Sequence, residues 1–226
     1  MGGQYNPRDR IRCPFRTLGF VYGRWGLSKR SILPYRAFVL LLSVVLLAAC
    51  ASATSPKGIV RVAPGLDLVM PQPRDLGRSL EATQLVSARF GDQTTVFEGH
   101  VSVTPERLLL VVLDPLGRKA LSVTWNGAAV VSEKADWLPQ ALRPENMLAD
   151  IILLYWPEAA VSRALAPSGG TLVGAPGSRS IFVAGQEVIH ADYLSAAEGA
   201  AWAGHAHYRN LPWGYDLDIQ SAIAAP

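Results

Sequence analysis

The chain has 226 residues, a formal net charge of +3 and a hydrophobic fraction of 50%. Eight basic residues and one acidic residue precede position 50, so this segment carries +7 and the remaining 177 residues carry −4. The remainder is long enough for one domain with a real core, and its charge gives no electrostatic support to a nucleic-acid-binding function.

The N-terminal segment ends in an apolar run, residues 37–49, directly before Cys50. This run is shorter than the roughly 20 residues that a membrane-spanning helix needs, but it matches the apolar part of a secretory signal peptide. The sequence Leu46-Leu47-Ala48-Ala49-Cys50 resembles a bacterial lipobox, in which the cysteine thiol receives a diacylglyceryl group. We therefore predict a leader with a lipoprotein signal peptide over residues 1–49 and acylation of Cys50.

The segment after the lipobox is small, polar and rich in proline. Such a composition predicts that residues 50–76 are an acylated cysteine followed by a flexible tether. Ala51 stands where many inner-membrane lipoproteins carry aspartate, so the expected location is the outer membrane, facing the periplasm. The other cysteine, Cys13, precedes the lipobox, which leaves the mature domain without a thiol for a disulfide, a metal site or a nucleophile.

From residue 77 onward, short runs alternate between apolar and polar residues. This period of two predicts strands at residues 96–103, 107–113, 119–125 and 128–133, with Asn126-Gly127 as a hairpin turn. Four more strands are predicted at residues 179–184, 187–194, 201–208 and 214–221. These segments favour an antiparallel meander.

Two helices are predicted between the groups of strands. Pro144 has the position of a helix start, and the apolar spacing continues to Tyr155, after which Trp156-Pro157 ends the pattern. A second short helix is predicted to start at Pro157-Glu158 and to end at Ser168-Gly169-Gly170, and the glycine-rich stretch 169–177 is expected to be a linker. The order of strands, helices and strands favours an α+β fold, in which a twisted antiparallel sheet curls and the helices cover one face.

Residues 107–117, with the sequence RLLLVVLDPLG, the strand after them and the two helices resemble LolB. LolB is the outer-membrane receptor that takes lipoproteins from the periplasmic carrier LolA. The chain is similar at least as closely to uncharacterised LolB-like lipoproteins, some of them associated with aryl-polyene pathways. The resemblance implies an incomplete, strongly curved β-barrel over residues 77–226, with a helical lid over a hydrophobic cavity for acyl chains.

In that family the leucine of Pro-Leu-Gly lies on a protruding loop and helps to deliver lipoproteins into the membrane. Leu116, between Pro115 and Gly117, is the matching residue. Proline and glycine on either side make a tight turn in which a large aliphatic side chain is hard to bury. The alternative is that Leu116 folds back onto the sheet, as single surface leucines often do.

The inward faces of the predicted strands and the first helix supply a candidate cavity lining. An ordinary hydrophobic core is the alternative for each residue, since the same side chains suit both. The candidates are Phe97, Val101, Val103, Leu121, Val123, Trp125, Ile151, Ile152, Trp202, Tyr208, Leu217 and Ile219.

A hairpin loop at residues 210–213 would place His205 opposite Asp218 and His207 opposite Asp216. Such pairs bind metals or sense pH in some proteins, but cross-strand pairing on a solvated face is the favoured interpretation. No motif of an enzyme, a nucleotide site or a metal site occurs in the sequence. We therefore expect no catalytic residue, no metal and no cofactor.

The sequence and the resemblance predict a non-enzymatic outer-membrane lipoprotein. It is expected to bind the acyl chains of a lipoprotein or of another lipid-linked envelope molecule, and to help insert that cargo into the outer membrane. The expected partners are lipidated cargo, a LolA-like periplasmic carrier and outer-membrane lipid. The alternative is a structural or assembly lipoprotein of a cell-envelope or aryl-polyene pathway that binds no lipid.

Overall fold

The computed structural model describes residues 54–55, 58–194 and 201–224. The predicted leader over residues 1–49 and the predicted acylation site at Cys50 lie outside the described residues. In the described part of the chain, no helix has the length and apolar character needed to cross a bilayer.

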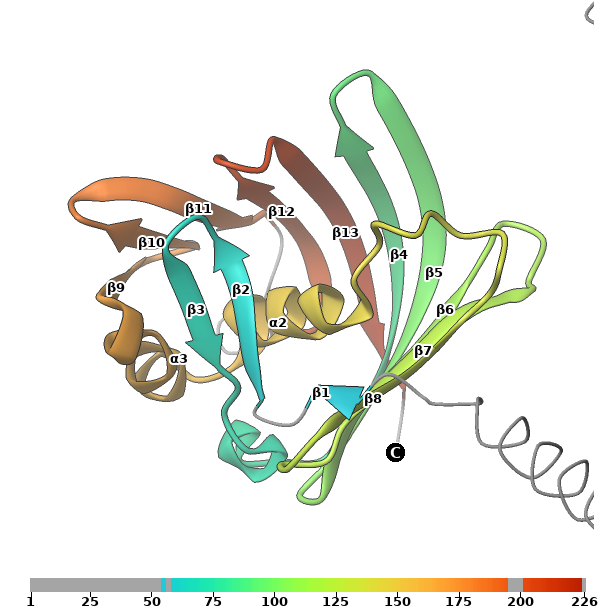
Figure 1. Ribbon diagram of the computed structural model, residues 1–226, viewed down its shortest axis with the longest axis horizontal. Helices are drawn as coiled ribbons and strands as arrows, with labels where there is room; N and C mark the ends of the chain where they lie inside the picture. The colour runs from blue at the N-terminus through green and yellow to red at the C-terminus, as the bar shows by residue number, and fades with distance from the viewer. Residues whose placement is uncertain (1–53, 56–57, 195–200, 225–226) are drawn as a thin grey trace, which may run out of the picture. The chain divides into compact units, whose positions relative to one another are not determined.

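Within these residues, eleven strands form one antiparallel sheet in the order β1-β8-β7-β6-β5-β4-β13-β12-β11-β10-β9 (Figure 1). Because β1 and β9 are its two edges, the sheet is open. The strands are β1 (Thr54–Ser55), β4 (Leu80–Phe90), β5 (Gln93–Thr104), β6 (Arg107–Leu113), β7 (Lys119–Trp125), β8 (Val130–Lys134), β9 (Gly170–Ala175), β10 (Ser178–Val183), β11 (Gln186–Tyr193), β12 (Gly204–Asn210) and β13 (Tyr215–Ile223).

The helices lie on the inner side of the bent sheet (Figure 1). Helix α2 (Pro144–Tyr155) begins with proline at its first position, and α3 (Glu158–Leu165) follows the break at Trp156-Pro157. Two short 3₁₀ helices are η1 (Pro73–Leu76) and η2 (Ala166–Ser168). The predicted bounds of the first helix, β6 and β7 agree with the structure, whereas the second α-helix ends at Leu165, three residues before the predicted end.

The alternating sequence pattern sets which face of each strand is buried. In β4, Leu80, Ala82, Gln84 and Val86 are buried, while the residues between them are exposed or half-buried. In β6, Leu108, Leu110 and Val112 are buried on the same side of the sheet. These inward rows pack with the apolar residues of α2 in one hydrophobic core. The side chains that form a site therefore lie between the sheet and α2.

The expected tether is wrong from Gly58 onward. Strands β2 (Ile59–Ala63) and β3 (Leu66–Val69) form a separate hairpin around the Pro64-Gly65 turn, and Val62, Leu66 and Leu68 are fully buried. The prolines of this segment lie in turns and at the ends of the strands, so they do not interrupt the ladder. The folded domain therefore begins about 20 residues before the predicted boundary at residue 77.

The expected linker at residues 169–177 is also wrong. Strand β9 pairs with β10 over its whole length, from Gly170 opposite Val183 to Ala175 opposite Ser178. Glycines weaken the sequence signal of a strand, yet they are tolerated at the edge of a sheet. Helix α3 packs against β9, which helps to hold this edge strand in place.

Candidate functional site

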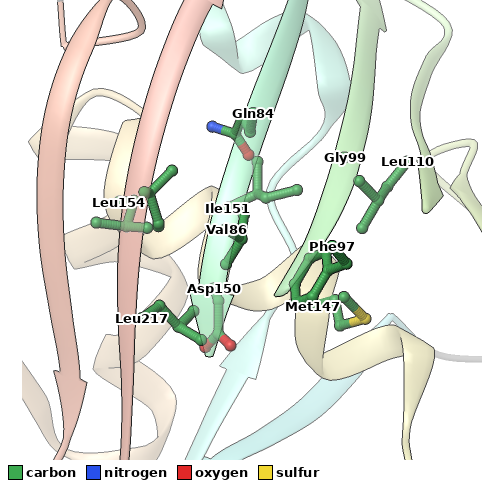
Figure 2. A pocket seen from close by; sticks show the side chains of 11 residues that line it. Gln84, Val86, Phe97, Gly99, Leu110, Met147, Asp150, Ile151, Leu154 and Leu217 are labelled. Atoms are coloured by element: carbon green, nitrogen blue, oxygen red, sulfur yellow. The ribbon is translucent and has the colours of Figure 1, made fainter. Parts of the chain in front are cut away.

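A small cavity lies between α2 and the inner face of the sheet (Figure 2). Its volume is about 40 Å³, which is room for a water molecule or two, whereas ligand pockets commonly measure about 300–1,000 Å³. The lining comes from β4, β5, β6, β13 and α2. It consists of Gln84, Val86, Phe97, Gly99, Leu110, Met147, Asp150, Ile151, Leu154, Leu217 and Ile219.

Four of the predicted cavity residues line this space, namely Phe97, Ile151, Leu217 and Ile219. The others are buried and belong to the core without lining it, namely Val101, Val103, Leu121, Val123, Trp125, Ile152, Trp202 and Tyr208. Helix α2 fills the concave side of the sheet, because its apolar residues reach the inward rows of the strands. In this arrangement the space is too small for an acyl chain.

The apolar surface continues from the cavity along β4, past the helix. Val86 lines the cavity, Ala88 pairs with Leu217, and Phe90 at the end of the strand is 64% exposed. These residues share the inner face because they alternate along β4. The β4–β5 hairpin extends beyond α2 (Figure 1). An apolar strip therefore leads from the rim of the sheet at Phe90 to the cavity.

One carboxyl group stands in the apolar wall of the cavity. Asp150 of α2 is buried and accepts hydrogen bonds from the hydroxyls of Tyr208, at 2.7 Å, and Tyr215, at 2.8 and 2.9 Å. Burial raises the pKa of Asp150 to about 7, although both tyrosine hydrogen bonds oppose the rise. Sequence reasoning missed this group, since Asp150 lies between apolar residues of the helix.

The same polar cluster ties three parts of the fold together. The Asn210 side-chain amide donates to the carbonyl oxygen of Val62 in β2 at 2.8 Å and approaches the Tyr215 hydroxyl at 3.4 Å. Asp150 and Tyr215 connect this point to α2 and β13. The cluster therefore fixes the helix and the β2–β3 hairpin against the sheet.

Further contacts hold the C-terminal end of α2. Arg179 of β10 donates from Nη1 to the carbonyl oxygens of Leu153, at 2.8 Å, and Trp156, at 3.1 Å, which have no partner within the helix. The Tyr155 ring stacks on Trp202 with 4.2 Å between centroids, and its hydroxyl accepts a hydrogen bond from Gln84 at 3.1 Å. Burial raises the pKa of Tyr155 to about 12. Displacement of the C-terminal end of α2 would have to break these contacts.

The Pro115-Leu116-Gly117 loop joins β6 to β7, and all three residues are exposed. Leu116 is 79% exposed. Asp114 organises the loop, because its Oδ1 accepts hydrogen bonds from the backbone N–H groups of Leu116, at 3.0 Å, and Arg118, at 2.9 Å. Gly117 has a φ of 74°, which favours glycine at this position. The loop thus presents Leu116 to solvent.

Asp114 also pairs with the Arg118 side chain, at 2.6 Å between Nη2 and Oδ2. Partial desolvation opposes ionisation, yet the hydrogen bonds from Arg118 and Leu116 hold the pKa of Asp114 below its ordinary value. The Arg118 guanidinium lies 5.2 Å from the ring centre of Trp137, whose side chain is 51% exposed. Two exposed residues with large apolar side chains, Leu116 and Trp137, therefore each contact a member of this ion pair.

The predicted register of the β12–β13 hairpin is wrong by two residues. Asn210 pairs with Tyr215 and the loop is Leu211–Gly214, so His205 faces Gln220 and His207 faces Asp218. Asn210 stays in the strand because its side chain bonds Val62. His205 reaches Asp218 diagonally, with 2.8 Å between Nε2 and Oδ2. Within the described residues, no group of three or more potential ligands is placed to hold a metal ion.

A second histidine, His190, lies on the outer face of the sheet within hydrogen-bonding distance of a serine and two carboxylates. His190 Nδ1 is 3.0 Å from Ser180 Oγ and 2.7 Å from Glu187 Oε1, and Nε2 is 3.0 Å from Asp192 Oδ1. Partial burial opposes protonation, but the two carboxylates raise the pKa of His190 above its ordinary value. Both carboxylates thus stabilise the protonated form of the imidazole beside Ser180.

Comparison with known proteins places the chain in a family. Residues 81–222, from β4 to β13, match the family model described as "Protein of unknown function (DUF3261)". The chain belongs to the DUF3261 family. The match includes both the cavity and the Leu116 loop of this DUF3261 member. It begins after the β2–β3 hairpin, so that hairpin lies outside the matched region.

No curated protein sequence matches this DUF3261 chain. Among solved structures, it is similar to a LolA superfamily protein from Nitrosomonas europaea, with 9% sequence identity and a TM-score of 0.39. The similarity covers 70% of this chain and 94% of that chain. The expected relation to LolB itself stays a prediction.

Proposed function

We propose that this DUF3261 protein is a non-enzymatic outer-membrane lipoprotein that holds an acyl chain of a lipidated envelope molecule on the inner face of its sheet. The observation that carries the proposal is the apolar strip from Phe90 through Ala88 and Leu217 to the cavity. An acyl chain needs a long apolar surface with little hydrogen-bonding capacity, and this strip supplies one. Leu116 is assigned to membrane contact during delivery.

Loading of the cavity requires α2 to move, because the closed space of about 40 Å³ is far smaller than an acyl chain. The N-terminal half of α2 is the part assigned to move. Met147 is half-buried and lines the cavity. The polar side-chain contacts of this half are those of Asp150 with the two tyrosines and of Asn146 with the carbonyl oxygen of Arg61 in β2, at 2.8 Å. The C-terminal end, held by Arg179 and Trp202, is assigned as the pivot.

A fluorescent fatty acid whose emission rises in an apolar environment tests this proposal. We expect saturable binding to the folded domain and displacement by unlabelled fatty acid. Gly99→Ile should weaken binding, because Gly99 lines the cavity and its added side chain would occupy that space. Thr171→Ile enlarges an exposed residue of the edge strand β9 and should leave binding unchanged. Equal binding by both variants and the original chain would contradict the assigned cavity.

The filled concave face favours a second candidate function. A structural or assembly lipoprotein that binds no lipid needs only a stable domain, and a closed α2 suits that role. The fatty-acid assay separates the two functions, since the absence of saturable binding would support the structural role. Depletion of LolB, with rescue by this chain and by its Leu116→Glu variant, would then test lipoprotein delivery against delivery of another lipid-linked molecule.

A further inference from the structure

Strand β6 is apolar on both of its faces. Its inward residues are buried in the core, while its outward residues Leu109, Val111 and Leu113 are half-exposed. A strand of an antiparallel sheet with one solvated face normally carries polar residues on that face. The outward row runs straight into the loop that exposes Leu116. The outer face of β6 therefore presents a continuous aliphatic row that ends in a protruding leucine.

The neighbours of this row limit its charge. Leu109 faces Ser102 on β5 and Thr124 on β7, and Val111 faces His100 on β5 and Ser122 on β7. Leu113 faces Glu98 on β5 and Lys119 on β7. The acidic residues that flank the row each have a side-chain partner, and that of Glu81 is the Ser102 hydroxyl, which donates to it at 2.6 Å. Glu98 lies 2.7 Å from His100, and Glu133 lies 3.0 Å from Lys119. Few unpaired charges would have to leave water if this face met an apolar phase.

The position of β1 decides how the domain can meet a bilayer. Thr54 pairs with Val131 of β8, which itself faces Thr124 of β7, at the end of the sheet opposite Leu116. Cys50 is four residues before Thr54, so its Cα lies at most about 14 Å from that of Thr54. The five residues from Thr124 to Lys119 span roughly 17 Å.

These lengths disfavour an upright orientation while β1 is paired. If the strands stood on end with Leu116 in the bilayer, Cys50 would not descend even to the level of Lys119, three residues short of Leu116. Its acyl chains would then have to cross water to enter the membrane, which exposes apolar methylene groups. With the strands lying along the surface, both ends of β6 reach the bilayer together.

We infer that the outer face of β6 is a lipid-contact surface, on which the domain lies with this strand along the bilayer. The inference rests on the proposed acylation of Cys50 and on the proposed membrane contact of Leu116. It adds the row Leu109, Val111 and Leu113 and fixes the orientation. The inner face and its apolar strip then face away from the membrane, and Phe90 remains in water.

Site-specific fluorescence tests this orientation on the acylated mature lipoprotein in vesicles of phosphatidylethanolamine and phosphatidylglycerol. An environment-sensitive fluorophore is attached in separate samples at Val111→Cys, Leu116→Cys and Phe90→Cys, while acylation blocks the sulfur of Cys50. Quenching by nitroxide-labelled lipid is measured. We expect quenching at positions 111 and 116 and none at position 90, because positions 90 and 116 share one end of the sheet but only 111 and 116 share the surface.

The other outcomes separate the competing arrangements. Quenching at 116 and 90 but not at 111 would mean an upright domain and would overturn the inference. Protection of the 111 label from aqueous iodide without nitroxide quenching would place a second copy on the row and would also overturn it. Quenching at 111 without 116 would support the surface and contradict the proposed role of Leu116. If Val111→Cys fails to fold, a label at Ser122→Cys, directly opposite on β7, replaces it and should be quenched.

Discussion

The hydroxyl of Tyr208 donates a 2.7 Å hydrogen bond to Oδ1 of Asp150, joining β12 to α2 inside an apolar core. Tyr215 shares the same carboxyl group from β13. No Lys or Arg side chain of the described residues forms an ion pair or hydrogen bond with Asp150, so its ionised form is stabilised by hydroxyls alone. The carboxyl is therefore the most costly charge in the contact between helix and sheet.

This arrangement predicts a stability that depends on the charge of Asp150. The pKa of Asp150 is about 7 in the folded state and about 3.9 in the unfolded state. Between these two pH values, Asp150 is protonated in the folded state and ionised in the unfolded state. The stabilisation is fully present below about pH 4 and is lost as pH rises through 7. At roughly 1.4 kcal/mol per pKa unit, the loss is of the order of 4 kcal/mol at most.

Urea unfolding of the original chain and of Asp150→Asn between pH 4 and pH 8 measures this effect. As pH rises, the free energy of unfolding of the original chain should fall relative to that of Asp150→Asn, because the amide cannot ionise. Asp136→Asn changes an exposed carboxyl and serves as the control. Parallel pH profiles for the original chain and Asp150→Asn would mean that Asp150 does not titrate in this range.

The Leu116 loop predicts a separation between stability and membrane binding. Leu116→Glu should leave the free energy of unfolding nearly unchanged, because the side chain is 79% exposed. It should reduce binding to vesicles about tenfold or more, since a buried leucine contributes roughly 1.5–3 kcal/mol and 1.4 kcal/mol is a factor of ten. Asp114→Ala should cause a smaller loss, because it removes the acceptor that fixes the loop. Vesicle flotation measures both variants, and unchanged flotation of Leu116→Glu would exclude the loop as a membrane contact.

The sequence predicts the elements whose pattern is local. Alternation in β6 and β7 and the proline at the start of α2 gave correct bounds, because each strand or helix buries one face with its own period. Strand β9 was missed, since its glycines and lack of charge resemble a loop. The β2–β3 hairpin was missed because Pro64-Gly65 and the prolines after it suggested a tether, although the residues between them alternate.

The features that involve distant residues could not be predicted from local pattern. Asn210 looks like a turn residue, and its bond to Val62, 148 positions away, helps to keep it in β12. Asp150 looks like one polar position in an apolar helix, and its tyrosine partners lie 58 and 65 positions further on. The predicted cavity residues were mostly core, because inward orientation does not show how closely a helix fills the space.

The packing of Gly58 predicts a direct test of where the folded domain begins. A Cβ on Gly58 would lie 2.4 Å from the Trp125 ring, and the φ of Gly58 is 55°. Gly58→Ala should therefore cost about 1–2 kcal/mol of backbone strain and a further 1–3 kcal/mol of overpacking. Gly65→Ala, at φ 75° with open space around it, should show the strain alone. Chemical denaturation measures the loss of stability in both variants. A loss near zero in each would mean that this segment is a tether.

The turn between β10 and β11 predicts a stabilising substitution. Ala184 and Gly185 form a two-residue loop between paired Val183 and Gln186, and Ala184 has a φ of 49°, which costs a residue with a Cβ roughly 1–2 kcal/mol. Asn-Gly is a preferred sequence for such a turn. Ala184→Asn should therefore raise the free energy of unfolding by about 0.5–1 kcal/mol.

Thermal unfolding measures this gain as a Tm increase of about 1–4 °C for a domain of this size. Gly185→Ala is the matched control, because Gly185 has a φ of 81° and open space around it. The control should lower stability by about 1 kcal/mol through backbone strain alone. In a turn with two positive φ angles, we expect Ala184→Asn to raise the free energy of unfolding and Gly185→Ala to lower it. A loss of stability in Ala184→Asn would show that Ala184 does not carry this strain.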